Sequence, residues 1–225
     1  MVDIGRCFTY VFEDRDWLKK VLIGAVLMLT GIGMIPVIGY GIEVARRVVK
    51  GNPQLLPEWD EWGTRIVEGF LTMAIGFIWA LPLILVSSCI WIILVPVAGV
   101  DESGTALGWV GIIASVCVGL VSLIYGLLLF LVLPAAIMRY ATTGQFSAAF
   151  RIGEVIGLVR SNLSLYLMVM VVSILANIVG SLGGVVVGCG AYFTLFYAVL
   201  ITYHAYGQAH RLAAGNVENE VQLSY

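Results

Sequence analysis

Charged residues are scarce in this chain. Asp, Glu, Lys and Arg make up only 12% of the 225 residues, whereas soluble domains carry about a quarter. The hydrophobic fraction is 60% and the mean hydropathy is +1.00, so a water-soluble domain and a disordered chain are both excluded. With 12 Lys and Arg against 14 Asp and Glu, no basic field exists to hold a nucleic acid. The composition predicts an integral protein of the cell membrane. Its expected partner is the lipid bilayer, and it is not expected to bind nucleic acid.

Clusters of chemically reactive side chains are also lacking. The four cysteines (Cys7, Cys89, Cys117 and Cys189) are scattered without a CxxC pair, which argues against a disulfide or a metal site. His204 and His210 are six residues apart, on different faces of any helix, and are expected as polar ends of the last helix at the membrane surface. We therefore expect no catalytic residue, no cofactor and no metal, and predict that the chain is not an enzyme.

Long apolar stretches dominate what is present. Four of them contain no Asp, Glu, Lys or Arg, namely 21–42, 69–100, 103–138 and 161–210. A crossing helix needs about 20 apolar residues, so the last stretch holds two, with a break between Leu182-Gly183-Gly184 and Gly188-Cys189-Gly190. The second and third stretches exceed one straight crossing, so we expect a tilt, an end outside the hydrocarbon or a kink at a proline. The prediction is a single all-α membrane domain, residues 1–211, with crossing helices at 69–100, 103–138, 161–182 and 187–207 and a polar tail at 212–225.

Basic residues gather in three segments, 1–20, 41–68 and 139–160. Lys and Arg in short loops favour the cytoplasmic side, which places the last four helices in alternation and both termini inside. A single crossing by 21–42 would instead leave residues 1–20 outside. We therefore predict a re-entrant hairpin, with 17–30 descending, 31–36 turning and 37–49 returning, and keep the single crossing as the alternative. Residues 43–68 then form a cytoplasmic connection.

Three amphipathic segments are expected to lie at the membrane interface. They are residues 1–20, with Ile4, Phe8, Val11 and Phe12 on one face, residues 59–70, and residues 146–160. Four aromatic residues, Trp17, Tyr40, Trp59 and Trp62, are predicted to anchor the chain at the headgroup level.

Several sequence blocks together resemble a known family. They are FTYVFEDRDWLKKVLIG at 8–24, GY followed by a basic helix from residue 39, LPEWDEWG at 56–63, AFRIGEVIGLVRSNLSLYL at 149–167 and YHAYGQAHR at 203–211. The chain resembles the prokaryotic domain-of-unknown-function 4013 family over residues 3–211, most specifically through LPEWDEWG. The resemblance implies an integral membrane protein of archaea and bacteria, and it implies no established activity or catalytic residue.

Small residues recur at four-residue spacing in two helices, a pattern that lets helices approach closely. One series is Gly111, Ser115 and Gly119, preceded by Gly104 and Gly108, and the other is Ala176, Gly180, Gly184 and Gly188. The second series competes with the turn predicted near Gly183-Gly184. Asn177 is expected to form a hydrogen bond between helices.

The four predicted crossing helices hold no ionisable residue between their ends, which disfavours a proton-coupled transporter. We predict a non-catalytic accessory or structural component that packs with other membrane subunits, with its own copies or with lipids. The alternative is a channel or carrier for a neutral or lipidic substrate, built around the broken hairpin.

Overall fold

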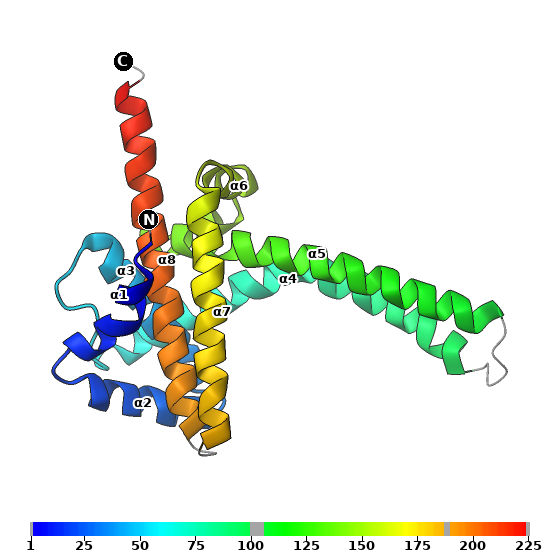
Figure 1. The fold of residues 1–225 in the computed structure, drawn as a ribbon, viewed down its shortest axis with the longest axis horizontal. Helices are drawn as coiled ribbons and strands as arrows, with labels where there is room; N and C mark the ends of the chain where they lie inside the picture. Colours follow the sequence, from blue (N-terminus) through cyan, green and yellow to red (C-terminus); the bar gives the residue numbers. More distant parts are fainter. Residues whose placement is uncertain (1, 100–105, 187–189, 224–225) are drawn as a thin grey trace.

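The computed structural model describes residues 2–99, 106–186 and 190–223, and every regular element in these ranges is a helix (Figure 1). The all-α class is therefore confirmed. The elements in chain order are α1 (Ile4–Thr9), η1 (Tyr10–Glu13), α2 (Trp17–Leu29), α3 (Met34–Lys50), α4 (Trp62–Gly99), α5 (Ala106–Thr143), η2 (Phe146–Phe150), α6 (Ile152–Ser161), α7 (Leu163–Val186) and α8 (Gly190–Leu223).

Helix α8 lies at the centre of the body. It contacts α1, α2, α3, α5 and α7, and Figure 1 shows α7 running beside it. Ala205, Ala209 and Ala213 are fully buried, and their four-residue spacing places them on one face of the helix. The N-terminal segment packs on this face of small side chains, and its Val2 and Cys7 belong to one apolar cluster with the three alanines.

Helices α3 and α4 cross at two glycines. A Cβ atom on Gly39 would lie 1.9 Å from the carbonyl oxygen of Arg65, and one on Gly69 would lie 1.8 Å from that of Ile35. Both distances are far inside van der Waals contact, so the two backbones touch where no other residue type fits. This contact fixes the start of α4 against α3.

Helices α4 and α5 pack together and extend away from the body (Figure 1). We call residues 80–99 of α4 and 106–130 of α5 the arm. The arm is joined to the body where Trp79 Nε1 donates a hydrogen bond to the Ala149 carbonyl at 3.2 Å, and residues 135–138 of α5 belong to the buried core. At 1.5 Å per residue, residues 80–99 rise about 30 Å, which is the thickness of the hydrocarbon layer. The parts of the apolar stretches 69–100 and 103–138 that exceed one crossing therefore lie in the body.

Three of the described helices are long and apolar enough to cross a membrane, at Trp62–Ile90, Ile112–Thr143 and Leu163–Gly184. Helix α8 is not among them, so the predicted count of four crossing helices is not confirmed. Its middle carries polar side chains, including His204 and Gln208, which contact the N-terminal segment. Helix α8 also continues through Leu223, so the predicted tail at 212–225 is helical over most of its length.

The N-terminal apolar stretch is two helices and not one. Helix α2 ends at Leu29 and α3 begins at Met34, and Gly31 in the turn has a φ of +72°, which glycine adopts without strain. The 13 residues of α2 rise only about 20 Å. Lys20 Nζ lies 2.7 Å from Glu58 Oε1, so the segments before and after this stretch cannot face opposite sides of a membrane. A single crossing by 21–42 is therefore wrong, whereas entry of the α2–α3 hairpin into the membrane stays a prediction.

The predicted limits of several segments need correction. Residues 1–20 are not one amphipathic helix, because the chain bends between η1 and α2. The segment 59–70 is not separate either, because α4 runs without interruption from Trp62 to Gly99. The segment 146–160 is divided into η2 and α6. Helix α7 continues to Val186, so the turn predicted at Gly183-Gly184 is wrong; residues 187–189 lie outside the described part.

Candidate functional site

The small-residue series in α7 is a helix interface within the chain. Ala176 is fully buried, and a Cβ atom on Gly180 would meet that of Ala198, in α8, at 3.1 Å. Thr194 Oγ1 donates a hydrogen bond to the Gly180 carbonyl across this interface at 2.8 Å. Asn177 does not bridge the helices as expected, because its Nδ2 donates to the Ser173 carbonyl of its own helix.

In the series in α5, Gly119 faces away from the rest of the described chain. Nothing lies within 4 Å of a Cβ atom built on Gly119, and Ser115 is half-buried. Residues that line the groove toward α4, such as Val118 and Val121, lie on another side of α5. The surroundings of Gly111, Gly104 and Gly108 lie outside the described residues. The exposed part of this series is available to a second molecule or to lipid.

Three of the four predicted aromatic anchors, Tyr40, Trp59 and Trp62, form a stack around Trp59. Its ring stacks on Tyr40 with centroids 4.3 Å apart and on Trp62 at 5.4 Å. Tyr40 is fully buried, and its hydroxyl donates to the Pro57 carbonyl at 2.8 Å, so this ring is a core residue instead of a headgroup anchor. Trp17 and Trp59 are half-buried and Trp62 is 40% exposed, so anchoring by these three stays a prediction.

A buried lysine holds the loop between α3 and α4. The Lys20 side chain is 2% exposed, and its ammonium lies 2.8 Å from Asp14 Oδ2 and 2.7 Å from Glu58 Oε1. It also donates to the Leu56 carbonyl at 3.2 Å, and Trp59 Nε1 donates to the Lys20 carbonyl at 3.0 Å. All three ammonium hydrogens therefore have acceptors.

The charges of this cluster stabilise one another. Burial by itself would lower the pKa of Lys20, but hydrogen bonds to Asp14 and Glu58 raise it above its ordinary value. Burial likewise acts to raise the pKa of Asp14, and hydrogen bonds from Lys20 and the Asp16 backbone outweigh it and lower that pKa. Both groups are therefore charged at neutral pH, and the cluster fastens the 56–63 motif to the start of α2.

The comparison with known families covers most of this structure. A family model described as a protein of unknown function, DUF4013, matches residues 22–189. The chain belongs to this family. The predicted resemblance is thus confirmed over a range that holds most of α2, all of α3, the 56–63 motif, the arm and all of α7. No curated protein and no solved structure matches the chain.

The DUF4013 match does not extend to the segments that flank it. Lys20 and Asp14 lie before the matched range, whereas their partners Glu58 and Leu56 lie inside it. Helix α8, which forms the centre of the body, begins just after the range ends. The N-terminal segment and α8 therefore complete the core of the matched part.

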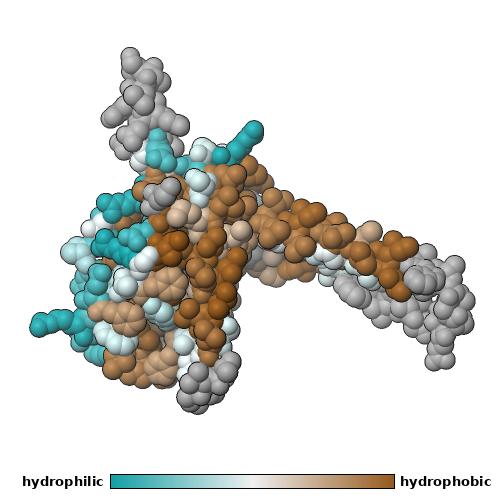
Figure 2. Space-filling model, viewed as in Figure 1, coloured by the Kyte–Doolittle hydropathy of each residue, from teal (hydrophilic) through white to brown (hydrophobic). Residues whose placement is uncertain are grey.

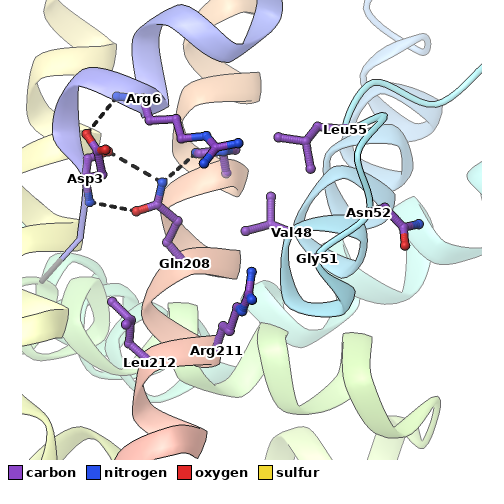
Figure 3. A pocket seen from close by; sticks show the side chains of 10 residues that line it. Asp3, Arg6, Val48, Gly51, Asn52, Leu55, Gln208, Arg211 and Leu212 are labelled. Atoms are coloured by element: carbon purple, nitrogen blue, oxygen red, sulfur yellow. Dashed lines mark hydrogen bonds between the residues drawn. The ribbon is translucent and has the colours of Figure 1, made fainter.

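A cavity of about 520 Å³ opens where the N-terminal segment, the end of α3 and the middle of α8 meet (Figure 3). Its lining residues are Asp3, Arg6, Val48, Gly51, Asn52, Leu55, His204, Gln208, Arg211 and Leu212. At the edge of the cavity Gln208 holds the N-terminal segment, because Gln208 Oε1 accepts a hydrogen bond from the Asp3 backbone N–H at 2.8 Å. Among the described residues, no group of three or more His, Cys, Asp or Glu side chains is placed to hold a metal ion.

His204 corrects the prediction of a polar end at the membrane surface. It is 1% exposed, stacks on Tyr10 at 4.1 Å, and its Nδ1 lies 3.4 Å from Cys7 Sγ. The sequence did not indicate this pairing, because the partners are 197 residues apart. The buried Lys20 cluster was also missed, although Lys20 directly precedes an apolar run, which is the one local sign that its charge needs a partner.

Proposed function

We propose that this DUF4013 protein is a non-catalytic component of the cell membrane that packs with other membrane subunits, with its own copies or with lipids. The observation that carries the proposal is the exposed apolar surface of α4 and α5, as far as the side chains of these two helices are described. In the most apolar stretch of Ile112–Thr143 no residue is buried, and in that of Trp62–Ile90 only 17% are. Figure 2 shows hydrophobic residues over the described part of the arm and along α7, with hydrophilic residues gathered on the opposite side of the body. Only lipid or another membrane protein covers such a surface at low cost.

The proposed orientation is supported by contacts that join the open ends of three helical hairpins. Lys20 bonds to the loop after α3, Trp79 and Ala149 join the base of the arm, and Asn216 Nδ2 donates to Asn162 Oδ1 at 2.9 Å beside the start of α7. All three basic segments therefore belong to one body. Because such segments favour the cytoplasm, we infer that the body and both termini are cytoplasmic.

Packing against a further subunit is supported by the outer face of α5. An open position at Gly119 lets a second helix approach closely. Leu at this position has space inside the chain and a better helix propensity than Gly, so Gly119→Leu is expected to leave the fold intact and block only contacts with other molecules.

The test is purification of the full chain from its native membrane in mild detergent, followed by mass spectrometry of what remains bound. We expect a stoichiometric membrane protein or a homo-oligomer for the wild type, and its loss in Gly119→Leu. The matched control is Ile124→Phe, which adds bulk at a position that is 60% exposed on another face of α5. It should keep the partner.

A monomer with no protein bound, or equal retention of the partner in both variants, would contradict the packing role. A homo-oligomer that holds a small neutral molecule and conducts it would instead favour the predicted alternative of a carrier.

A further inference from the structure

Two arginines from distant parts of the chain face the same cavity. Figure 3 shows the side chain of Arg6, from α1, and that of Arg211, from α8, reaching toward the segment from Gly51 to Leu55. Within the described part of the chain, neither guanidinium has a hydrogen bond or an ion pair, whereas Arg46 and Arg47 nearby are both paired with Glu43. The cavity thus holds two uncompensated positive groups.

Arg211 lies beside the end of α3 but forms no hydrogen bond with it in the described part of the chain. A Cβ atom on Gly51 would lie 3.4 Å from Arg211 Nη1, so the guanidinium sits against the helix terminus. Two carbonyls of the last turn already have donors, because Gly51 N bonds to the Val48 carbonyl at 3.1 Å and Asn52 N bonds to the Arg47 carbonyl at 3.0 Å. The five N–H donors of Arg211 are left for another acceptor.

Among the described residues that line the cavity, Asp3 is the only one with a carboxylate. Its Oδ1 accepts a hydrogen bond from the Arg6 backbone at 3.0 Å, as the N-cap of α1. Two guanidiniums against one carboxylate leave a net positive charge in the cavity. Gln208 and Asn52 add amide groups to the lining, and Val48 and Leu55 add apolar walls.

We propose that this cavity binds a phosphate-bearing anion, with Arg6 and Arg211 as its two charged ligands. Arginine pairs with phosphate oxygens through two parallel N–H donors, and a volume of about 520 Å³ is within the range of small-molecule sites. The apolar walls suit the glycerol or acyl part of such a molecule. The same chemistry is present in the headgroup of an acidic phospholipid and in a soluble phosphate ester.

The experiment uses the full chain in nanodiscs and separates the two sources. In the first measurement, glycerol phosphate is titrated by calorimetry into protein held in phosphatidylcholine. In the second measurement, phosphatidic acid is added to the nanodisc, and the lipid retained by the protein after transfer to detergent is counted by native mass spectrometry. Binding in the first measurement identifies a soluble ester, and retention in the second alone identifies a lipid headgroup.

The variant Arg6→Gln/Arg211→Gln should weaken binding by at least about tenfold in whichever measurement detects it, since each arginine supplies a charge-assisted hydrogen bond. The affinity of Arg211→Lys should lie between those of the wild type and the double variant, because a lysine keeps the charge and loses the two parallel donors. The matched control is Arg15→Gln/Arg160→Gln, which removes the same charge from two exposed residues outside the cavity and should bind as the wild type does. The proposal is overturned if neither probe binds, or if the cavity variant and the control lose binding equally.

Discussion

The buried Lys20 makes the sharpest prediction for stability. Replacing it by Met keeps the apolar stem and removes the ammonium that contacts Asp14, Glu58 and the Leu56 carbonyl. The Asp14 side chain is 10% exposed, so Lys20→Met leaves a nearly buried carboxylate without its partner. The loop that carries the 56–63 motif loses its attachment to α2 at the same time.

The size of the effect depends on which partner stays buried. Removing one member of a buried ion pair costs about 3–5 kcal/mol. Glu58 is 53% exposed and regains water when Lys20 is removed, so its share is small. Asp14 and the Leu56 carbonyl remain, for which we expect a loss of about 2–3 kcal/mol in the free energy of unfolding.

The assay is reversible unfolding in mixed micelles, followed by far-ultraviolet circular dichroism at neutral pH. Lys20→Met, Asp14→Asn and the double variant form a thermodynamic cycle. The double variant should be more stable than the sum of the single effects by about 1–2 kcal/mol, because the asparagine that replaces Asp14 carries no charge to be left unpaired. A loss below about 0.5 kcal/mol for Lys20→Met, or simple additivity, would refute the reasoning.

The same pair predicts a dependence on pH. The pKa of Asp14 is lowered from 3.8, so its stabilisation is fully present above that value and is lost as the pH falls through the lowered pKa. The pKa of Lys20 is raised from 10.5, so its stabilisation is present below that value and is lost as the pH rises through the raised pKa. The contribution of the pair to the stability of the wild type should be constant between these limits and be lost beyond them. In Lys20→Met the burial of the unpaired Asp14 acts to raise its pKa, so the stability difference between wild type and variant should be largest near neutral pH and should begin to shrink above pH 3.8 as the solution becomes acidic. A difference that grows as the pH falls from neutral would contradict the assignment.

Two further pairs of variants test the helix contacts in the same unfolding assay. Thr194→Val should lower the free energy of unfolding by about 1 kcal/mol, since it removes the hydrogen bond between α7 and α8. Asn177→Leu should lower it by less than about 0.5 kcal/mol, because its hydrogen bond is within α7. Equal losses in the two variants would contradict this. Gly39→Ala should cost more than about 3 kcal/mol through its clash with the α4 backbone, whereas Gly63→Ala, with nothing within 4 Å, should be neutral or stabilising. Full stability of Gly39→Ala would show that α3 and α4 cross elsewhere.

The parts of the fold that could be predicted are those written locally in the sequence. An uncharged apolar run is its own evidence for a membrane helix, which is why the stretches in α4, α5 and α7 were found. Gly31 and its neighbours likewise marked the break between α2 and α3. The same logic predicts a fourth crossing in α8, which is not confirmed, because the lack of charge over residues 190–210 suits a buried central helix equally well.

The contacts within the body were beyond a sequence argument, because they join residues far apart in the chain. Gln208 bonds to Asp3 across 205 positions, and no local pattern distinguishes it from an exposed glutamine. Tyr40 shows the same ambiguity, since a tyrosine suits a headgroup and a core equally well when its hydroxyl has a partner. The carbonyl of Pro57 supplies that partner, and only the folded loop brings it there.

The charge count and the fold bear on topology for different physical reasons. The rule for Lys and Arg treats each as a free charge near the membrane, yet Arg46 bonds to Glu43, Glu68 and the Ala141 carbonyl, and Arg65 is 3% exposed. Such residues resist crossing because each is fixed to a body with many buried polar bonds, which would all have to be desolvated together. The contact between Lys20 and Glu58 then keeps residues 1–20 with that body whatever their own charge. Neutralising the basic residues of 1–20 other than Lys20 should therefore leave the N-terminus on its original side.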